Sequence, residues 1–151
     1  MPRPMKLPAH WASLAKPLDG LGRLETMLED AAALTGTSDL RFDRRAVLVL
    51  CADNGVVAQG VSQTDAGVTR AVLENLVARR TSVCRMAAAA RCAVVPVDMG
   101  IAGASVPGAV DCRIAPGTQD FTQGAAMTRA QAVQGIAAGI QLVREQKRAG
   151  M

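Results

Sequence analysis

Hydrophobic residues form two short continuous runs separated by a longer helical pattern. The runs are AVLVLC at positions 46–51 and AVVPV at positions 93–97, and both are rich in valine. Runs of this length are typical of strands buried on both faces of a parallel sheet. Between them, apolar residues recur at helical spacing and predict a single helix of about twenty residues that ends near Arg91. Strand, helix and strand in this order predict a βαβ unit with a right-handed crossover.

Two further helical patterns flank this unit. Apolar residues at helical spacing in positions 24–34, followed by Gly36, predict a helix that stops at that glycine. Residues 128–131 (TRAQ) form a capping box, in which a threonine and a glutamine each accept a backbone hydrogen bond of the first turn. The apolar residues that follow it predict a final helix that runs to about Arg148.

These elements predict an α/β fold with a Rossmann-like parallel sheet and flanking helices. The glycine-rich residues 100–124 contain one short strand candidate, Cys112 to Ala115, and are otherwise expected to be loop. Pro96 predicts an edge position or a local irregularity, because proline cannot donate to a neighbouring strand. Two firm strands cannot cover three long helices, so the sheet is expected to be incomplete. We assign residues 1–40 to an N-terminal arm and helix, and residues 41–151 to the N-terminal part of an α/β domain.

Composition limits the class of protein. Half of the 151 residues are apolar and a fifth are charged, which predicts one soluble folding unit without a membrane partner. The formal charge is +4 but aromatic residues make up only 2%, so no nucleic-acid partner is expected. The four cysteines lack a C-x-x-C pair, and His10 is the only histidine, so no metal site is expected. Without an apolar signal segment we expect a cytoplasmic protein whose cysteines are core residues, with a disulfide or a catalytic thiol as the alternatives.

Polar residues with candidate chemistry follow both predicted strands. Asp53-Asn54-Gly55 comes directly after the first run, and Asp98 and Gly100 follow the second. Ligands of open α/β sheets bind beyond the carboxyl ends of parallel strands, so these residues predict one shared substrate-binding crevice. The alternative interpretation is that Asn54-Gly55 is only a turn. The sequence has no G-x-G-x-x-G, no G-x-x-x-x-G-K-[ST] and no Ser-His-Asp set, so patterning alone supports neither nucleotide-loop nor serine chemistry.

Four motifs occur in a defined order along the chain. They are KPLDGLGRLE at 16–25, CADNGVVAQGVS at 51–62, VVPVDMGIAG at 94–103 and RIAPGTQDFTQGAAMTRAQA at 113–132. In sequence and spacing they resemble the N-terminal part of the nicotinate-nucleotide dimethylbenzimidazole phosphoribosyltransferase family, which makes the lower-ligand nucleotide of cobalamin. Four ordered motifs are far more specific than a single short pattern.

The resemblance implies a reaction and its substrates. Family members transfer the phosphoribosyl group of nicotinate mononucleotide to a nitrogen of 5,6-dimethylbenzimidazole, with inversion at the anomeric carbon. The products are nicotinate and α-ribazole 5'-phosphate, and neither a metal nor another cofactor is required. The chemistry needs an apolar slot for the flat base, N–H groups around the phosphate, and a carboxylate that takes the imidazole proton. The resemblance also implies small-molecule substrates and a homodimer.

The resemblance also implies roles for particular residues. Asp53, Asn54 and Gly55 match the family's strand-end motif. Thr64 and Val72 fall where the family lines its benzimidazole pocket, and Val68 lies one helical turn before Val72. For the two valines, plain core packing is the alternative interpretation.

The chain departs from the family pattern at several positions. Asn54 replaces the common histidine, and Asp19-Gly20 replaces Gly-Ser in the first motif. A glutamine is often found near position 71 or 72, where this chain has Ala71 and Val72. Pro116, Asp120 and Ala125 replace arginine, asparagine and proline. The family's glycine-rich E-x-G-x-x-N-T-T segment and its general-base glutamate are expected beyond position 151. We therefore expect no catalytic residue in this chain and no activity of the chain alone; the alternative is a non-catalytic, base-binding half-domain that pairs with a separate C-terminal half.

Overall fold

The structure is a computed structural model that describes residues 14–17 and 20–151. Most of the predicted N-terminal arm, including His10, lies outside the described residues. The chain divides into two units, with the boundary between Asp43 and Arg44. Each unit is described by itself.

The first unit contains helix α2 (Arg23–Thr35). Gly36 ends the helix in a left-handed conformation, which confirms the predicted stop. At the other end, the Glu25 carboxylate accepts a hydrogen bond from the Leu21 N–H at 3.1 Å and lies 2.9 Å from Lys16 Nζ. The hydrogen bonds from Lys16 and Leu21 lower the Glu25 pKa. This carboxylate therefore ties the preceding turn to the start of α2.

The second unit is built on a parallel sheet with the strand order β1-β2-β3. Strand β1 spans Arg45–Ala52, β2 spans Cys92–Gly100 and β3 spans Val110–Asp111. The pairing of β1 with β2 is continuous until a bulge shifts the register between Cys51 and Ala52. The parallel sheet and its flanking helices confirm the predicted α/β class.

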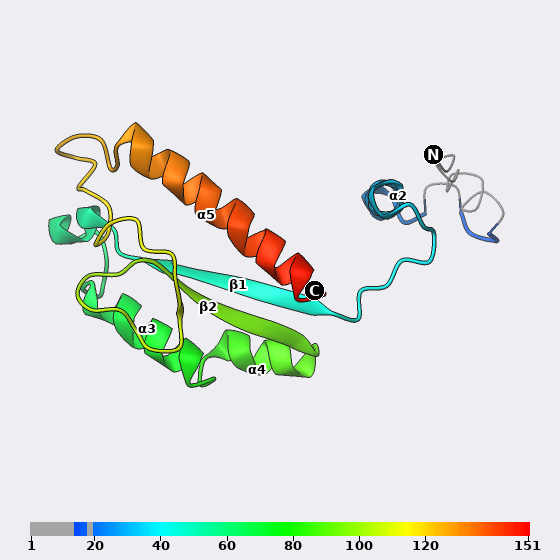
Figure 1. Cartoon of the computed structure of the whole chain (residues 1–151), viewed down its shortest axis with the longest axis horizontal. Helices are drawn as coiled ribbons and strands as arrows, with labels where there is room; N and C mark the ends of the chain where they lie inside the picture. Colours follow the sequence, from blue (N-terminus) through cyan, green and yellow to red (C-terminus); the bar gives the residue numbers. More distant parts are fainter. Residues whose placement is uncertain (1–13, 18–19) are drawn as a thin grey trace. The chain divides into compact units, whose positions relative to one another are not determined.

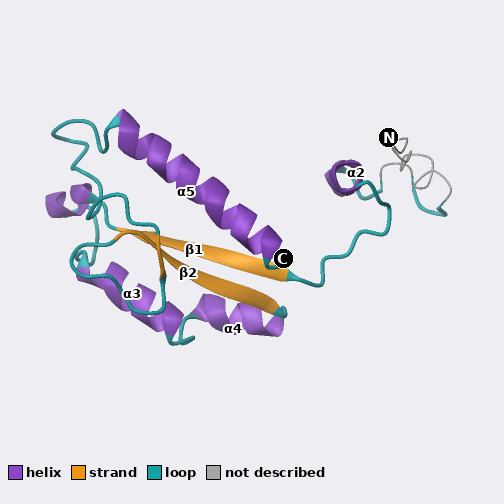
Figure 2. Cartoon of the chain, viewed as in Figure 1, coloured by secondary structure: helices purple, strands orange, loops and turns teal. Residues whose placement is uncertain are grey.

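Helices lie on both sides of this sheet. Helices α3 (Gly67–Val77) and α4 (Ser82–Ala89) connect β1 to β2 and pack on one side, whereas α5 (Arg129–Arg148) runs along the other (Figures 1 and 2). None of the helices in the described part of the chain is long and apolar enough to cross a membrane. The core lies between the sheet and α3 and α4, and it contains Cys51, Leu73, Leu76, Cys84, Ala87, Val94, Ile101 and Val106.

The last helix starts as predicted but presents an apolar face to solvent. Thr128 Oγ1 accepts from the Gln131 N–H at 3.2 Å, and Gln131 Oε1 accepts from the Thr128 N–H at 2.8 Å, which confirms the capping box. Leu142 is the buried residue of α5. The large aliphatic residues of its outer face, Val133, Ile136, Ile140 and Val143, are exposed.

Two details of the predicted elements are wrong. The helical pattern between the strands forms two helices, because Arg79 adopts φ 59° and Thr81 starts a second helix by accepting from the Cys84 N–H at 3.4 Å. The strand expected at Cys112 to Ala115 is instead the two-residue β3, which lies just before it. The N–H groups of Cys112 and Ile114 still donate to β2, to the carbonyl oxygens of Asp98 and Met99, so this segment follows β2 without forming a regular ladder.

The prediction that the first run is buried on both faces is also wrong. Leu50 is 55% exposed, and four of the other residues of β1 are only partly buried. Successive residues of a strand point to opposite faces, and Leu50 therefore lies on the face opposite the core residue Cys51, where cover is incomplete.

Arg79 and Pro96 reduce the pairing capacity of the open edge of β2. Strand β3 pairs only with Val97 and Asp98, so the edge before Val97 has no described strand beside it. The Val94 carbonyl, which points to this edge, accepts from Arg79 Nη1 at 2.7 Å. Pro96 has the same orientation as Val94 and lacks an N–H, in agreement with the predicted edge position. The edge therefore offers little to an incoming strand.

Arg79 and Arg91, the two non-glycine residues with positive φ among the described residues, provide a matched test of this contact. Arg91 adopts φ 51°, and no hydrogen bond of its side chain is found among the described residues. Glycine relieves about 1–2 kcal/mol of backbone strain at either site, but at Arg79 it also removes a charged donor worth about 1.5 kcal/mol or more. We expect Arg79→Gly to be less stable than Arg91→Gly by about 1–2 kcal/mol in urea unfolding. Equal stability of the two variants would contradict the role given to Arg79.

Candidate functional site

The carboxyl ends of β1 and β2 meet at one edge of the sheet. The Asp53 N–H donates to the Gly100 carbonyl at 3.0 Å, which joins the two strand ends directly. Asp53 is 8% exposed, and its Oδ2 accepts from the Ala102 N–H at 2.7 Å. The predicted proximity of the Asp53 and Asp98 segments is therefore present in the structure.

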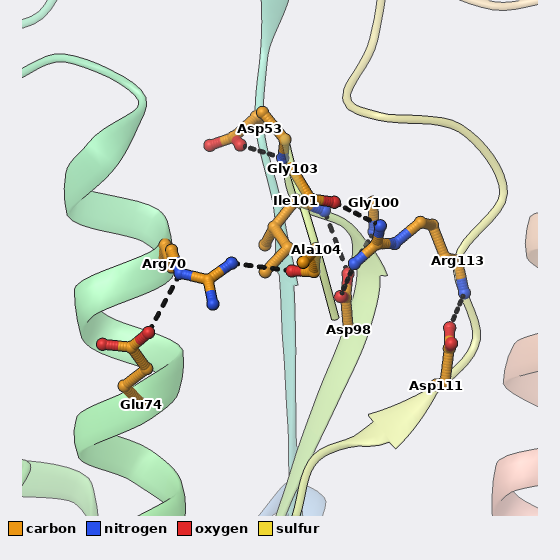
Figure 3. Close-up of polar contacts among 11 residues, drawn as sticks. Asp53, Arg70, Glu74, Asp98, Gly100, Ile101, Gly103, Ala104, Asp111 and Arg113 are labelled. Atoms are coloured by element: carbon orange, nitrogen blue, oxygen red, sulfur yellow. Dashed lines mark hydrogen bonds and ion pairs between the residues drawn. The ribbon is translucent and has the colours of Figure 1, made fainter. Parts of the chain in front are cut away.

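Asp98 is a buried ion-pair residue. Its side chain is 1% exposed; Oδ1 accepts from the N–H groups of Gly100 and Ile101 at 2.9 Å each, and Oδ2 lies 2.7 Å from Arg113 Nη2 (Figure 3). Burial raises the pKa of this carboxyl, but the hydrogen bonds from Arg113 and the two N–H groups outweigh it and leave the pKa lowered. Asp98 is therefore ionised and fully engaged by protein donors.

Two arginines fasten the loop that leaves β2. Arg113 Nη1 donates to the Gly103 carbonyl at 2.6 Å, and Arg70 Nη1 donates to the Ala104 carbonyl at 2.7 Å (Figure 3). Arg70 is oriented in turn by Glu74, at 2.9 Å. Four side chains thus hold the start of this loop. They are Asp53, Arg70, Asp98 and Arg113.

Residues 115–120, named the 115–120 segment, lie directly against the residues that follow β1. Its Thr118 N–H donates to the Asp53 carbonyl at 3.0 Å, and Thr118 Oγ1 accepts from the Gly55 N–H at 3.2 Å. A Cβ on Gly55 would lie 2.6 Å from the Thr118 carbonyl and from the Asp120 nitrogen. A Cβ on Gly117, whose φ is 87°, would lie 3.2 Å from the Asp53 carbonyl oxygen. Glycine at these two positions allows the two backbones to touch.

A cleft of about 580 Å³ opens at this edge of the sheet. One wall is the strand end and the 3-10 helix η1 (Gly55–Gln59), a second is the turn before α3, and a third is the 115–120 segment. Its lining residues are Asp53, Asn54, Gly55, Val57, Ala58, Ser62, Gln63, Thr64, Asp65, Ala66, Ala102, Pro116, Gly117 and Thr118. Apolar side chains, hydroxyls and backbone groups together suit a flat ring with a polar edge.

The structure brings together four of the eight predicted site residues. Asp53, Asn54, Gly55 and Thr64 line the cleft. Asp98 and Gly100 lie behind it and shape its floor through the contacts described above. Val68 and Val72 are on α3 outside the cleft lining, each 43% exposed.

Several residues that build the cleft lie within the quoted motifs but were not among the eight predicted site residues. Ala102 and the Pro116–Thr118 turn belong to a glycine-rich stretch that reads as loop. The contacts that Arg70 and Arg113 make with loop carbonyls are visible only in the geometry of the structure. The glycine of the motif RIAPGTQ was the one available indication of a close approach.

A second cavity of about 270 Å³ lies on the other side of the Gly117-Thr118 turn. It is bounded by the first turns of α5 and by the ends of β1 and β2, with Met99, Ile114 and Met127 among its apolar lining. Among residues 14–17 and 20–151, no group of three or more His, Cys, Asp or Glu side chains is placed to hold a metal ion.

A parallel α/β sheet with a partly apolar cleft at its carboxyl edge defines a Rossmann-like domain that binds small molecules. A family model described as Phosphoribosyltransferase matches residues 4–151. The chain belongs to the family of nicotinate-nucleotide dimethylbenzimidazole phosphoribosyltransferases, as its four motifs indicated.

Individual relatives and a solved structure support the same family assignment. The chain is similar to the nicotinate-nucleotide–dimethylbenzimidazole phosphoribosyltransferase of Acetivibrio thermocellus, with 37% identity over 140 residues, covering 92% of this chain and 40% of the relative. It is 40% identical over 124 residues to the enzyme of the same name from Salmonella agona, covering 82% and 35%. The crystal structure of CobT from Thermus thermophilus matches with a TM-score of 0.84 and 36% identity, covering 95% of this chain and 44% of that one. The chain thus spans less than half the length of these relatives.

Neutralising Asp98 tests the ion pair behind the cleft. Asp98→Asn keeps the shape of the side chain but leaves the partly buried Arg113 charge unpaired, so we expect a loss of about 2–3 kcal/mol in the free energy of unfolding. Glu74→Gln removes a more exposed ion pair and should cost less than about 0.5 kcal/mol. Because the Asp98 pKa is lowered in the folded state, the advantage of the wild type over Asp98→Asn is present above about pH 4 and disappears as the pH falls through the folded-state pKa. Urea unfolding from neutral to acidic pH measures both effects, and a pH-independent gap would contradict the assignment.

Adding a methyl group at Gly55 tests the close contact with the 115–120 segment. Gly55→Ala should destabilise the protein by about 1–3 kcal/mol, because its Cβ collides with backbone that cannot rotate away. Gly124→Ala is the control, since its Cβ would have no neighbour within 4 Å, and it should change stability by less than about 0.5 kcal/mol. Thermal unfolding compares the two variants. Equal melting temperatures would show that the two segments are not packed as described.

Proposed function

We propose that this chain forms the base-binding part of a phosphoribosyltransferase site. In the proposed reaction the phosphoribosyl group of nicotinate mononucleotide passes to a nitrogen of 5,6-dimethylbenzimidazole, giving nicotinate and α-ribazole 5'-phosphate for cobalamin lower-ligand assembly. The observation that carries the proposal is the cleft at the ends of β1 and β2, lined by the motif residues Asp53, Asn54 and Gly55 and by Thr64. It occurs in a chain that is 37% identical to an enzyme named for this reaction.

The contents of the cleft suit a neutral, flat heterocycle. Val57, Ala58 and Pro116 supply apolar surface, while Thr64 and Asn54 supply donors and acceptors at the rim. No lysine or arginine is among the lining residues, so the cleft suits the uncharged base better than the phosphate of the nucleotide. We therefore assign the dimethylbenzimidazole ring, rather than the phosphate, to this cleft.

The proposal assigns the role of proton acceptor to no carboxylate that the structure places at this edge of the sheet. A general base must reach its proton with a free lone pair and a pKa near the working pH. Asp98 is buried, ion-paired and lowered in pKa. Asp53 is buried against the Ala102 N–H, and Asp65 accepts from the Gly67 N–H at 2.9 Å in the turn that precedes α3. These carboxylates organise backbone, and the proposal gives none of them the catalytic role.

The binding and turnover steps are tested separately. The purified 151-residue chain should bind 5,6-dimethylbenzimidazole in a calorimetric titration, and Ala58→Phe, which fills the cleft, should weaken binding at least about tenfold. Ala89→Phe at the end of α4 is the matched control and should bind like the wild type. With nicotinate mononucleotide added, chromatography should detect no α-ribazole 5'-phosphate. Turnover by the isolated chain would overturn the assignment of the base, and equal binding by the two phenylalanine variants would overturn the assignment of the cleft.

A second candidate is a non-catalytic half-domain that pairs with a separate C-terminal half. The exposed apolar stripe of α5 and the exposed Leu50 of β1 favour it, because both need a covering surface. Adding a separately produced C-terminal half, taken from one of the relatives named above, tests this pairing. Activity that appears only in the mixture supports pairing.

A further inference from the structure

We infer that Asp120 is a positioning residue that sets the width of the base cleft through one hydrogen bond to Gln59. Gln59 is the last residue of η1, and its Nε2 donates to Asp120 Oδ2 at 2.6 Å. Helix η1 and the 115–120 segment each supply a wall of the cleft, and neither Gln59 nor Asp120 is itself among the lining residues. The contact therefore joins two walls of the cleft beside its lining, between residues 61 positions apart in sequence.

The second oxygen of the Asp120 carboxylate is held by hydrogen bonds from Thr122. Asp120 Oδ1 accepts from the Thr122 N–H at 2.9 Å and from Thr122 Oγ1 at 2.8 Å, which fixes the rotation of the carboxyl group. The Thr122 N–H and the Gln59 and Thr122 side chains lower the Asp120 pKa, so the group accepts as a carboxylate at neutral pH. A charge-assisted hydrogen bond of this kind is stronger than a neutral one.

Among the described residues, the bond from Gln59 to Asp120 is the contact that holds the outer end of η1 to the 115–120 segment. At the inner end, the Gly55 N–H donates to Thr118 Oγ1, and the Gly55 backbone packs against the 115–120 segment. No residue of η1 is buried, so its outer turn has no core contact of its own. A wall anchored at its inner end and tied at its outer end by a single bond changes the opening when that bond is lost. The width of the opening selects for the thickness of a planar ring, which is why the contact bears on specificity.

The chemistry of the pair allows an exchange of donor and acceptor. Gln59→Glu places two carboxylates face to face and should separate the walls. Asp120→Asn alone should be tolerated, because its Oδ1 still accepts from Thr122 and the Gln59 amide can turn to present its oxygen. The double variant Gln59→Glu with Asp120→Asn should restore the contact, with the amide at position 120 now donating. Gln123→Glu is the matched control, since it adds the same charge to the same loop without facing Gln59.

Two readouts separate this inference from the proposed function. Amide hydrogen exchange of residues 55–60 needs no ligand; it should be about tenfold faster in Gln59→Glu and unchanged in Asp120→Asn, in the double variant and in Gln123→Glu. Affinity for 5,6-dimethylbenzimidazole, which rests on the proposed function, should follow the same order, with Gln59→Glu weakened about three- to tenfold. Normal exchange in Gln59→Glu, or no rescue by the double variant, overturns the positioning role. The expected exchange pattern in a protein that does not bind the base supports the contact and refutes the proposed function instead.

Discussion

The arrangement of the cleft depends on the buried carboxylate of Asp98. A charge at 1% exposure is tolerable only when each oxygen has strong donors, and here Oδ1 has two backbone N–H groups and Oδ2 has a guanidinium. Satisfying these needs fixes three pieces of backbone at once. The end of β2 must turn so that Gly100 and Ile101 point inward, and the 110–114 segment must deliver Arg113. Arg113 then reaches past Asp98 to the Gly103 carbonyl, so the same ion pair also sets the path of the loop.

The second constraint is steric and is satisfied by glycine. The 115–120 segment can donate to the Asp53 carbonyl only if it approaches the end of β1 at backbone contact distance. Side chains at positions 55 and 117 would prevent that approach. The buried ion pair holds the β2 side of the site, and the close packing of glycines holds the β1 side. Together they bring residues from three separate motifs to one edge of the sheet.

The sequence was sufficient for those features that depend on local pattern. Apolar runs identified β1 and β2, the capping box identified α5, and the motif order identified the family, because each is encoded by residues near one another in the chain. Features that depend on distant partners were not accessible in this way. The break between α3 and α4 requires the left-handed backbone of Arg79, which is an uncommon conformation for arginine. The positions of Val68 and Val72 outside the cleft depend on how α3 rotates to bury Leu73 and Leu76, and a helical period alone does not distinguish a pocket-facing valine from a solvent-facing one.

The two sides of the cleft differ in how firmly they are held, and this difference has a functional consequence. The floor and the β2 side are tied by buried groups whose loss is costly, so their geometry persists whatever the cleft contains. The outer end of η1 is tied by the exposed contact between Gln59 and Asp120, and contacts of this kind contribute little to folding. A substitution there leaves the fold intact while it alters the opening. Because the 115–120 segment is packed against Gly55 and Asp53, we expect the outer end of η1 to be the part of the cleft wall that sequence change can move without unfolding the domain.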